Sequence, residues 1–124
     1  MTEFLIKGKT VKFKIVLINF PFDDFSEKKL RPSLCLTDPI SKFRHIVFAP
    51  ITSNLNNATE ITDLIIEKTE VDFAKTGLKV SSVIKLHRLL TASDNIIQKT
   101  IGNLPESYYN RIYENLKLLF SISQ

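Results

Sequence analysis

The chain has 124 residues, of which 44% are hydrophobic and 24% charged, with a formal net charge of +4. This length suits one domain, residues 1–124, and the composition is that of a globular protein rather than a disordered tail. The lone Cys35 excludes an intrachain disulfide, and with only two histidines no zinc site is expected. Neither a signal pattern nor an apolar run of membrane-spanning length is present, so we expect a soluble cytoplasmic protein that does not bind membranes.

The excess positive charge lies in the N-terminal half. Residues 1–58 contain nine Lys or Arg against five Asp or Glu, whereas the remaining residues contain eight of each. A basic half suits a polyanionic partner, although a solvated lysine-rich face is the commoner cause of such an excess.

Six segments rich in β-branched, aromatic or alternating apolar residues predict strands. They are residues 13–22, 33–37, 45–53, 64–66, 82–89 and 96–101. Between the fourth and fifth of them, residues 70–77 predict a single helical turn closed by Gly77.

After Gly102 the apolar residues follow helical spacing, and Pro105 and Glu106 suit the start of a helix. The expected apolar face consists of Tyr109, Ile112, Tyr113, Leu116, Leu119 and Phe120. Short strands followed by one amphipathic helix predict a mainly β fold with α, a small antiparallel β-barrel with a C-terminal amphipathic helix.

Two segments carry groups that can bind a phosphodiester, Lys28-Lys29-Leu30-Arg31-Pro32 and Pro50-Ile51-Thr52-Ser53. A guanidinium offers two parallel donors to phosphate oxygens, and a threonine hydroxyl can hydrogen-bond the phosphate or a leaving oxygen. The alternatives are a surface arginine paired with Asp24 or Glu27 and an ordinary strand threonine.

The ordered set of motifs resembles the MazF/PemK-like toxins of bacterial type II toxin–antitoxin pairs over nearly the whole chain. The motifs are Ile15-Val16-Leu17-Ile18-Asn19-Phe20-Pro21-Phe22, Arg31-Pro32-Ser33-Leu34-Cys35-Leu36, Pro50-Ile51-Thr52-Ser53, residues 78–84 and Ile101-Gly102-Asn103-Leu104. The resemblance implies an SH3-like barrel and a homodimeric endoribonuclease without a metal or other cofactor. It also implies cleavage of single-stranded RNA at short specific sequences, leaving a 2′,3′-cyclic phosphate and a 5′-hydroxyl. A cognate antitoxin would cover the RNA groove, and the pair would bind DNA together.

By this resemblance Arg31 is the catalytic arginine and Thr52 the catalytic hydroxyl, with Ser53 supporting it. Residues 26–30 resemble the mobile loop that covers the family's RNA groove. The RNA-binding candidates are Phe25 for base stacking, with Glu27, Lys28 and Lys29, in and beside this loop, and Ser53 next to Thr52. The alternative for the two lysines is an ordinary solvated surface.

One departure from the family lies at the start of the first strand, where Phe13-Lys14 stands in place of the usual Gly-Asp. The two histidines, His45 and His87, belong to no motif and are expected to be partly exposed strand residues without a catalytic role. Cys35 is expected to be a buried packing residue.

Two other functions stay open at this point. One is a non-catalytic barrel module that binds nucleic acid or poisons a protein such as DNA gyrase. The other is a degenerate toxin that retains only antitoxin binding.

Overall fold

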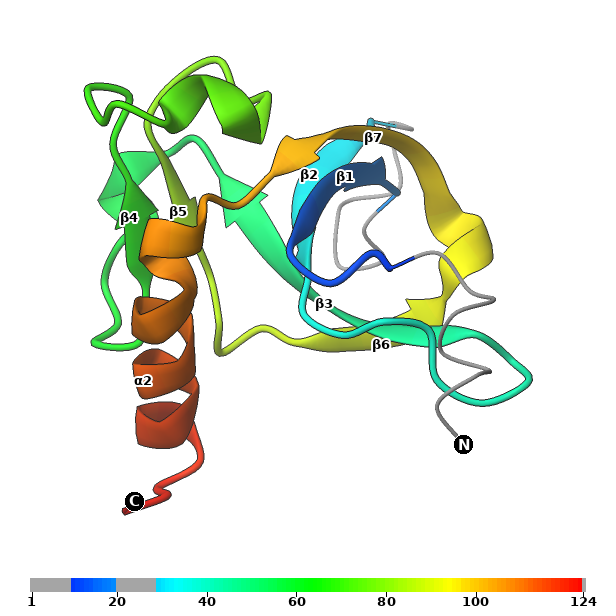
Figure 1. Ribbon diagram of the computed structural model, residues 1–124. Coiled ribbons are helices and arrows are strands. Elements are labelled where there is room, and N and C mark those ends of the chain that lie inside the picture. The colour runs from blue at the N-terminus through cyan, green and yellow to red at the C-terminus, as the bar shows by residue number, and fades with distance from the viewer. Residues whose placement is uncertain (1–9, 20–28, 124) are drawn as a thin grey trace.

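The computed structural model describes residues 10–19 and 29–123, which form one antiparallel sheet and a C-terminal helix (Figure 1). The strands are β1 (Lys14–Ile18), β2 (Arg31–Cys35), β3 (His45–Thr52), β4 (Leu64–Ile66), β5 (Ser82–Ile84), β6 (Leu90–Ser93) and β7 (Ile97–Asn103). Their order is β4-β5-β3-β2-β1-β7, with β6 also paired to β3. Figure 1 shows β7 curving from the side of β1 towards β6, so that the sheet closes on itself as the predicted small barrel.

Strand β3 is the centre of this sheet. One of its edges pairs with β2, and its other edge pairs first with β6 and then with β5. The N-terminal half of β3, His45–Phe48, lies against β6, whereas Ile51 and Thr52 lie against β5. The longest strand of the described chain therefore joins the barrel to the β4–β5 hairpin.

Several predicted strand boundaries are wrong, and β6 is a strand that the sequence did not predict. Strand β2 begins at Arg31 rather than Ser33, because Arg31 and Pro32 pair with Ile18 and Leu17 of β1. The predicted strand 82–89 ends at Ile84, since the chain turns after Lys85 and re-enters the sheet as β6. The alternation of apolar and polar residues at 85–89 therefore lies in a turn and not in a strand. Of the predicted strand 13–22, residues 20–22 lie outside the described residues.

The predicted helical elements are present. The turn at 70–77 is the 3-10 helix η2 (Phe73–Thr76), closed by Gly77 in the left-handed conformation. The C-terminal helix α2 (Tyr109–Leu119) follows the 3-10 turn η4 (Glu106–Tyr108). Two further 3-10 turns are η1 (Leu55–Asn57) and η3 (Asp94–Ile96). No helix in the described ranges has the length and apolar character to cross a membrane.

The predicted apolar face of the last helix is only partly correct. Ile112 is fully buried, and Tyr109 and Leu116 pack against the same core. Tyr113 and Phe120 are instead 40% and 59% exposed, and Phe120 follows the last residue of α2. Helix α2 packs against β4. Its C-terminal end projects beyond the sheet (Figure 1).

The core has two parts, on the two faces of the sheet. The larger part joins Ile15, Leu34, Ile51 and Ile84 to the helix residue Ile112. The smaller part fills the barrel and contains Cys35, which is fully buried, as predicted. Burial raises the pKa of the Cys35 thiol to about 12, which disfavours the thiolate that a nucleophile requires.

Phe13 lies before β1 rather than in it, in the left-handed region with a φ of 70°. A glycine adopts this conformation without strain, so the backbone keeps the form that the family's usual glycine favours. The Phe13 ring is 5% exposed and stacks on Tyr109 at a centroid distance of 4.0 Å. Contact between this ring and α2 compensates for the backbone strain.

The two effects at Phe13 can be separated by substitution. We expect Phe13→Ala to lower the free energy of unfolding by about 3–5 kcal/mol, because a buried ring is lost. Phe13→Gly should be more stable than Phe13→Ala by about 1 kcal/mol, because glycine relieves the left-handed strain. Urea denaturation measures both.

The matched control is Ile15, which is fully buried in the regular part of β1. There the order should reverse, with Ile15→Gly less stable than Ile15→Ala, since glycine costs about 0.5–1 kcal/mol in a strand. The same order at both positions would contradict the conformation described for Phe13.

Candidate functional site

The pairing of β2 with β3 brings the two predicted catalytic residues together. Ser33 lies opposite Pro50, and continuing this register by two residues places Arg31 level with Thr52. The buried Ser33 hydroxyl reinforces the pairing by donating to the carbonyl of Ala49 at 2.9 Å. Arg31 is exposed at the start of β2, and Thr52 is half-buried at the end of β3.

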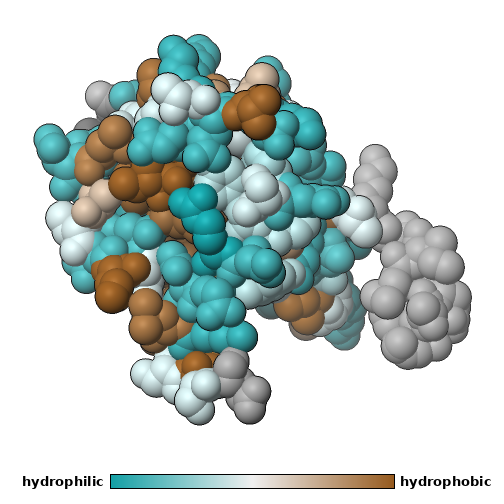
Figure 2. Space-filling model, turned by 60° about the vertical axis from the view of Figure 1, so that its left-hand side comes forward, coloured by the Kyte–Doolittle hydropathy of each residue, from teal (hydrophilic) through white to brown (hydrophobic). Residues whose placement is uncertain are grey.

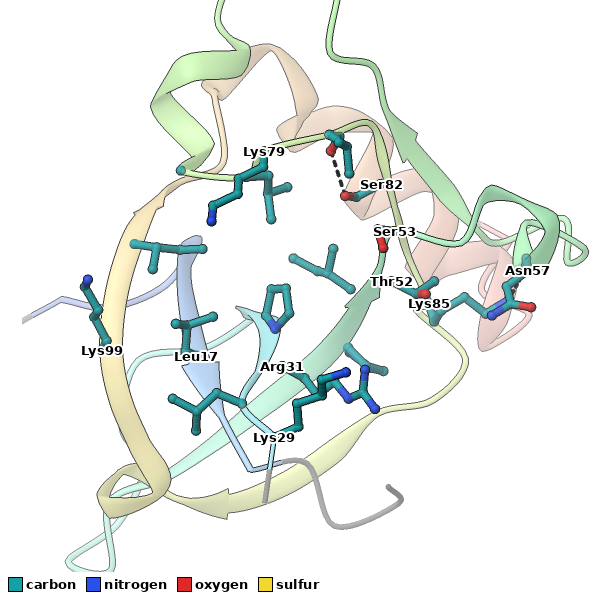
Figure 3. Close-up of a pocket in the computed structure, with 18 of the residues that line it drawn as sticks. Leu17, Lys29, Arg31, Thr52, Ser53, Asn57, Lys79, Ser82, Lys85 and Lys99 are labelled. Carbon is teal, nitrogen blue, oxygen red and sulfur yellow. Dashed lines mark hydrogen bonds between the residues drawn. The ribbon is translucent and has the colours of Figure 1, made fainter. Parts of the chain in front are cut away.

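Both residues line a cavity of about 1060 Å³ (Figure 3). Its apolar lining comes from β1, β2, β3, β7 and the segment that follows η2. Leu17 lies opposite Pro32 of β2 and Lys99 of β7, so one row of paired residues crosses three strands of the cavity. Figure 3 shows Lys99 at the β7 end of this row, Thr52 at the other side of the cavity, and Lys79 on the segment above.

The cavity is strongly cationic. Among its described lining residues there are six Lys or Arg and no Asp or Glu: Lys29, Arg31, Lys79, Lys85, Arg88 and Lys99. Lys85 is paired with Asp63, a buried carboxylate behind the cavity wall, at 2.8 Å. Such a concentration of one charge attracts a polyanion.

The Thr52 hydroxyl has a defined orientation. Its Oγ1 accepts a hydrogen bond from the backbone N–H of Asn54 at 3.1 Å. A hydroxyl has one donor and two acceptor positions, so this bond leaves its proton available to another acceptor. Ser53 is exposed beside Thr52 and also lines the cavity.

Two glycines allow the far wall of the cavity to form. A Cβ on Gly77 would lie 2.0 Å from the carbonyl oxygen of Ile101, and one on Gly102 would lie 2.4 Å from the carbonyl of Thr76. Only glycine permits these backbones to approach so closely. The approach holds η2 against β7 and places Lys79 on the same side of the cavity as Lys99 (Figure 3).

The remaining candidates divide into three groups. Lys29 lines the cavity, whereas Phe25, Glu27 and Lys28 lie outside the described residues. His45 is exposed at the opposite end of β3 from Thr52. His87 is also exposed, but it lies in the turn after β5 rather than in a strand, with Nδ1 3.8 Å from Oδ1 of Asp63.

Sequence reasoning missed four of the lining cations, Lys79, Lys85, Arg88 and Lys99. They lie in the half of the chain whose charges balance, so composition gave no signal. Lys79 and Lys85 fall within or next to the matched segment 78–84, which is the one feature that could have indicated them. Within the described ranges no group of three or more His, Cys, Asp or Glu is arranged to hold a metal ion.

Solved structures with a similar fold include mycobacterial toxins. The Mycobacterium tuberculosis toxin MazF-mt6 aligns with a TM-score of 0.68 and 22% identity, over 90% of this chain and 99% of that one. A mycobacterial endoribonuclease in complex with its cognate antitoxin gives 0.64 and 9%, over 92% and 95%. A further Mtb toxin gives 0.63 and 21%, over 86% and 100%. At these identities the likeness establishes the fold.

Family membership comes from a separate comparison. None of the curated proteins compared with the chain matches it. The family model described as PemK-like, MazF-like toxin of type II toxin-antitoxin system matches residues 12–120. This match spans nearly all of the chain, and the chain also has the fold of a MazF toxin. The protein therefore belongs to the PemK-like, MazF-like toxins of type II toxin–antitoxin systems.

Proposed function

We propose that this toxin is an endoribonuclease that cleaves single-stranded RNA at short specific sequences without a metal ion. The observation that supports this most is that Arg31 and Thr52 line one cationic cavity without an acidic residue among its described lining. A related fold is that of a mycobacterial endoribonuclease, which agrees with the proposal.

In the proposed reaction the ribose 2′-oxygen attacks the adjacent phosphorus. The 2′-hydroxyl loses its proton, a new P–O bond forms, the bond to the 5′-oxygen breaks, and that oxygen takes up a proton. The products are a 2′,3′-cyclic phosphate and a 5′-hydroxyl.

Arg31 would stabilise the negative charge that develops on the phosphorus oxygens. Its guanidinium can donate two parallel charge-assisted hydrogen bonds. We assign it this role alone, because a group with a pKa above about 12 is a poor base. Its register position level with Thr52 agrees with both groups acting on one phosphate.

Thr52 would donate its hydroxyl proton to the phosphate or to the leaving 5′-oxygen. The bond from Asn54 N–H occupies one acceptor position of Oγ1 and thereby favours a fixed direction for the proton. A donor aimed in advance needs no reorganisation during the reaction. Ser53, next to Thr52, would support this hydroxyl at the same end of the cavity.

We also propose a homodimer and a cognate antitoxin as partners. Three apolar residues at and after the C-terminal end of α2 are about half exposed: Leu118, Phe120 and Ile122. Figure 2 shows apolar side chains among hydrophilic ones on the side of the molecule that carries α2. Such residues suit burial against a second protein surface. An antitoxin with an acidic segment would fit the cationic cavity.

Cleavage is tested with a mixed single-stranded RNA in EDTA. We expect wild-type protein to generate 5′-hydroxyl ends, Arg31→Ala to cleave roughly 100- to 1,000-fold more slowly, and Thr52→Val at least about 10-fold more slowly. Mapping of the 5′ ends measures this.

The control is Arg44→Ala, which removes an exposed arginine paired with Asp94 at 2.6 Å, away from the cavity. Its cleavage rate should equal the wild-type rate. An inert wild type, or full activity in the Arg31 variant, would refute the assignment. RNA binding without cleavage would favour the non-catalytic module.

The cationic wall predicts a salt effect on RNA binding. In a Thr52→Val background, the double change Lys79→Ala and Lys99→Ala should weaken binding and reduce the slope of log K against log salt by about 1.4. Each lost phosphate contact on a single strand lowers that slope by about 0.7. The measurement is fluorescence anisotropy across a salt series.

A matched pair of lysines outside the cavity serves as control. Lys68→Ala with Lys117→Ala makes the same change in net charge, and neither residue lines the cavity. This pair should leave the slope within experimental error. Equal slopes for both double variants would mean that Lys79 and Lys99 act only through net charge.

A further inference from the structure

We infer that Lys85 is a positioning residue for Thr52. Its buried ammonium holds the turn after β3, and that turn supplies the N–H that orients the Thr52 hydroxyl. The inference rests on the proposed role of Thr52, and it adds a residue to which neither the motifs nor the family match gives a role.

Lys85 is buried and paired, which is rare for a lysine. It is 8% exposed, and its Nζ lies 2.5 Å from the carbonyl oxygen of Asn57 and 2.8 Å from Oδ2 of Asp63. The Asp63 side chain is 3% exposed, and the same Oδ2 accepts the N–H of Glu60 at 2.9 Å. The pair is therefore largely removed from water.

Stability alone gives little reason for such a pair. Transferring two charges from water is costly, and well-packed apolar residues often stabilise a site as well or better. The pair instead fixes the positions of the groups that it contacts, because an ammonium hydrogen-bonds its acceptors at set positions. Lys85 contacts the middle of the segment 53–63 through Asn57 and its end through Asp63. Its own backbone N–H donates to Pro50 of β3 at 2.9 Å.

The held segment leads directly to Thr52. Within η1 the N–H of Asn57 donates to the carbonyl of Asn54 at 2.9 Å, and the Asn54 side chain accepts the N–H of Asn56 at 3.1 Å. Asn54 then donates its own N–H to Oγ1 of Thr52. A continuous series of hydrogen bonds through one tight turn therefore connects Lys85 to Thr52, by way of Asn57 and Asn54.

The direction of the Lys85 amine favours positioning over contact with substrate. Figure 3 shows Lys85 beside Thr52 in the cavity wall, with its amine directed to Asn57. Two of the three ammonium donors are used by Asn57 and Asp63. We therefore assign contact with the substrate phosphate to the exposed cations of the same cavity.

A double-mutant cycle between Lys85 and Thr52 tests the inference. We expect Lys85→Met to slow single-turnover RNA cleavage at least about 10-fold while changing the Kd for an uncleavable all-deoxy oligonucleotide less than about 3-fold. In a Thr52→Val background the same change should slow cleavage less than about 2-fold, because its effect acts through the missing hydroxyl. Independent, multiplying effects would overturn the inference.

A second variant guards against a folding defect. Lys85→Met leaves the buried Asp63 carboxylate without its ammonium partner, so Lys85→Met with Asp63→Leu should restore much of the lost thermal stability. We expect cleavage to stay slow in this double variant. Recovery of the rate together with the stability would show that Lys85 serves stability alone.

A readout without RNA separates this inference from the proposed function. The amide of Asn54 should exchange with solvent at least about 10-fold faster in Lys85→Met than in wild type, measured by NMR. The control amide is Val47, which donates to the Thr37 hydroxyl at 3.2 Å in the sheet and should be unaffected. Unchanged exchange at Asn54 would refute the positioning role. If the wild type cleaves no RNA but the Asn54 amide still exchanges faster in Lys85→Met, only the nuclease assignment would be refuted.

Discussion

The register between β2 and β3 is the constraint on which the site depends. Pairing of Ser33 with Pro50 puts Arg31 level with Thr52, and the buried Ser33 hydroxyl bonded to Ala49 reinforces this alignment. A slip of one residue would turn each β3 side chain to the other face of the sheet. Burial of Leu34, opposite Ala49 in the larger core, opposes such a slip. Packing therefore fixes the relation between the two proposed catalytic groups.

The cavity gathers charge from parts of the chain that are distant in sequence. Arg31 begins β2 and Lys29 lies just before it, Lys79 follows η2, and Lys99 lies in β7. Close contact between η2 and β7 brings the last two to one side. Because these cations share one cavity, their potentials add there, although the net charge of the chain is only +4.

The departure at Phe13 illustrates how a local sequence rule can be broken and compensated. The left-handed conformation survives without glycine, because the ring stacks on Tyr109 and the backbone bonds both Cys35 and Leu104. The strain is therefore offset by contacts from the sheet and from α2. None of those contacts is visible in the residues next to Phe13 along the chain.

Periodicity along the chain determined most strands, the turn at Gly77, the C-terminal helix and the fold class, because these patterns are local. Motif order also indicated Arg31 and Thr52 and the family. Only the tertiary structure decided that residues 85–89 form a turn between β5 and β6, that Phe120 stays exposed, and that Lys79 and Lys99 line the same cavity as the proposed catalytic pair. It also decided that Lys85 is buried against Asp63. The physical reason is that partners across a sheet are chosen by register and packing, which spacing along one chain does not specify.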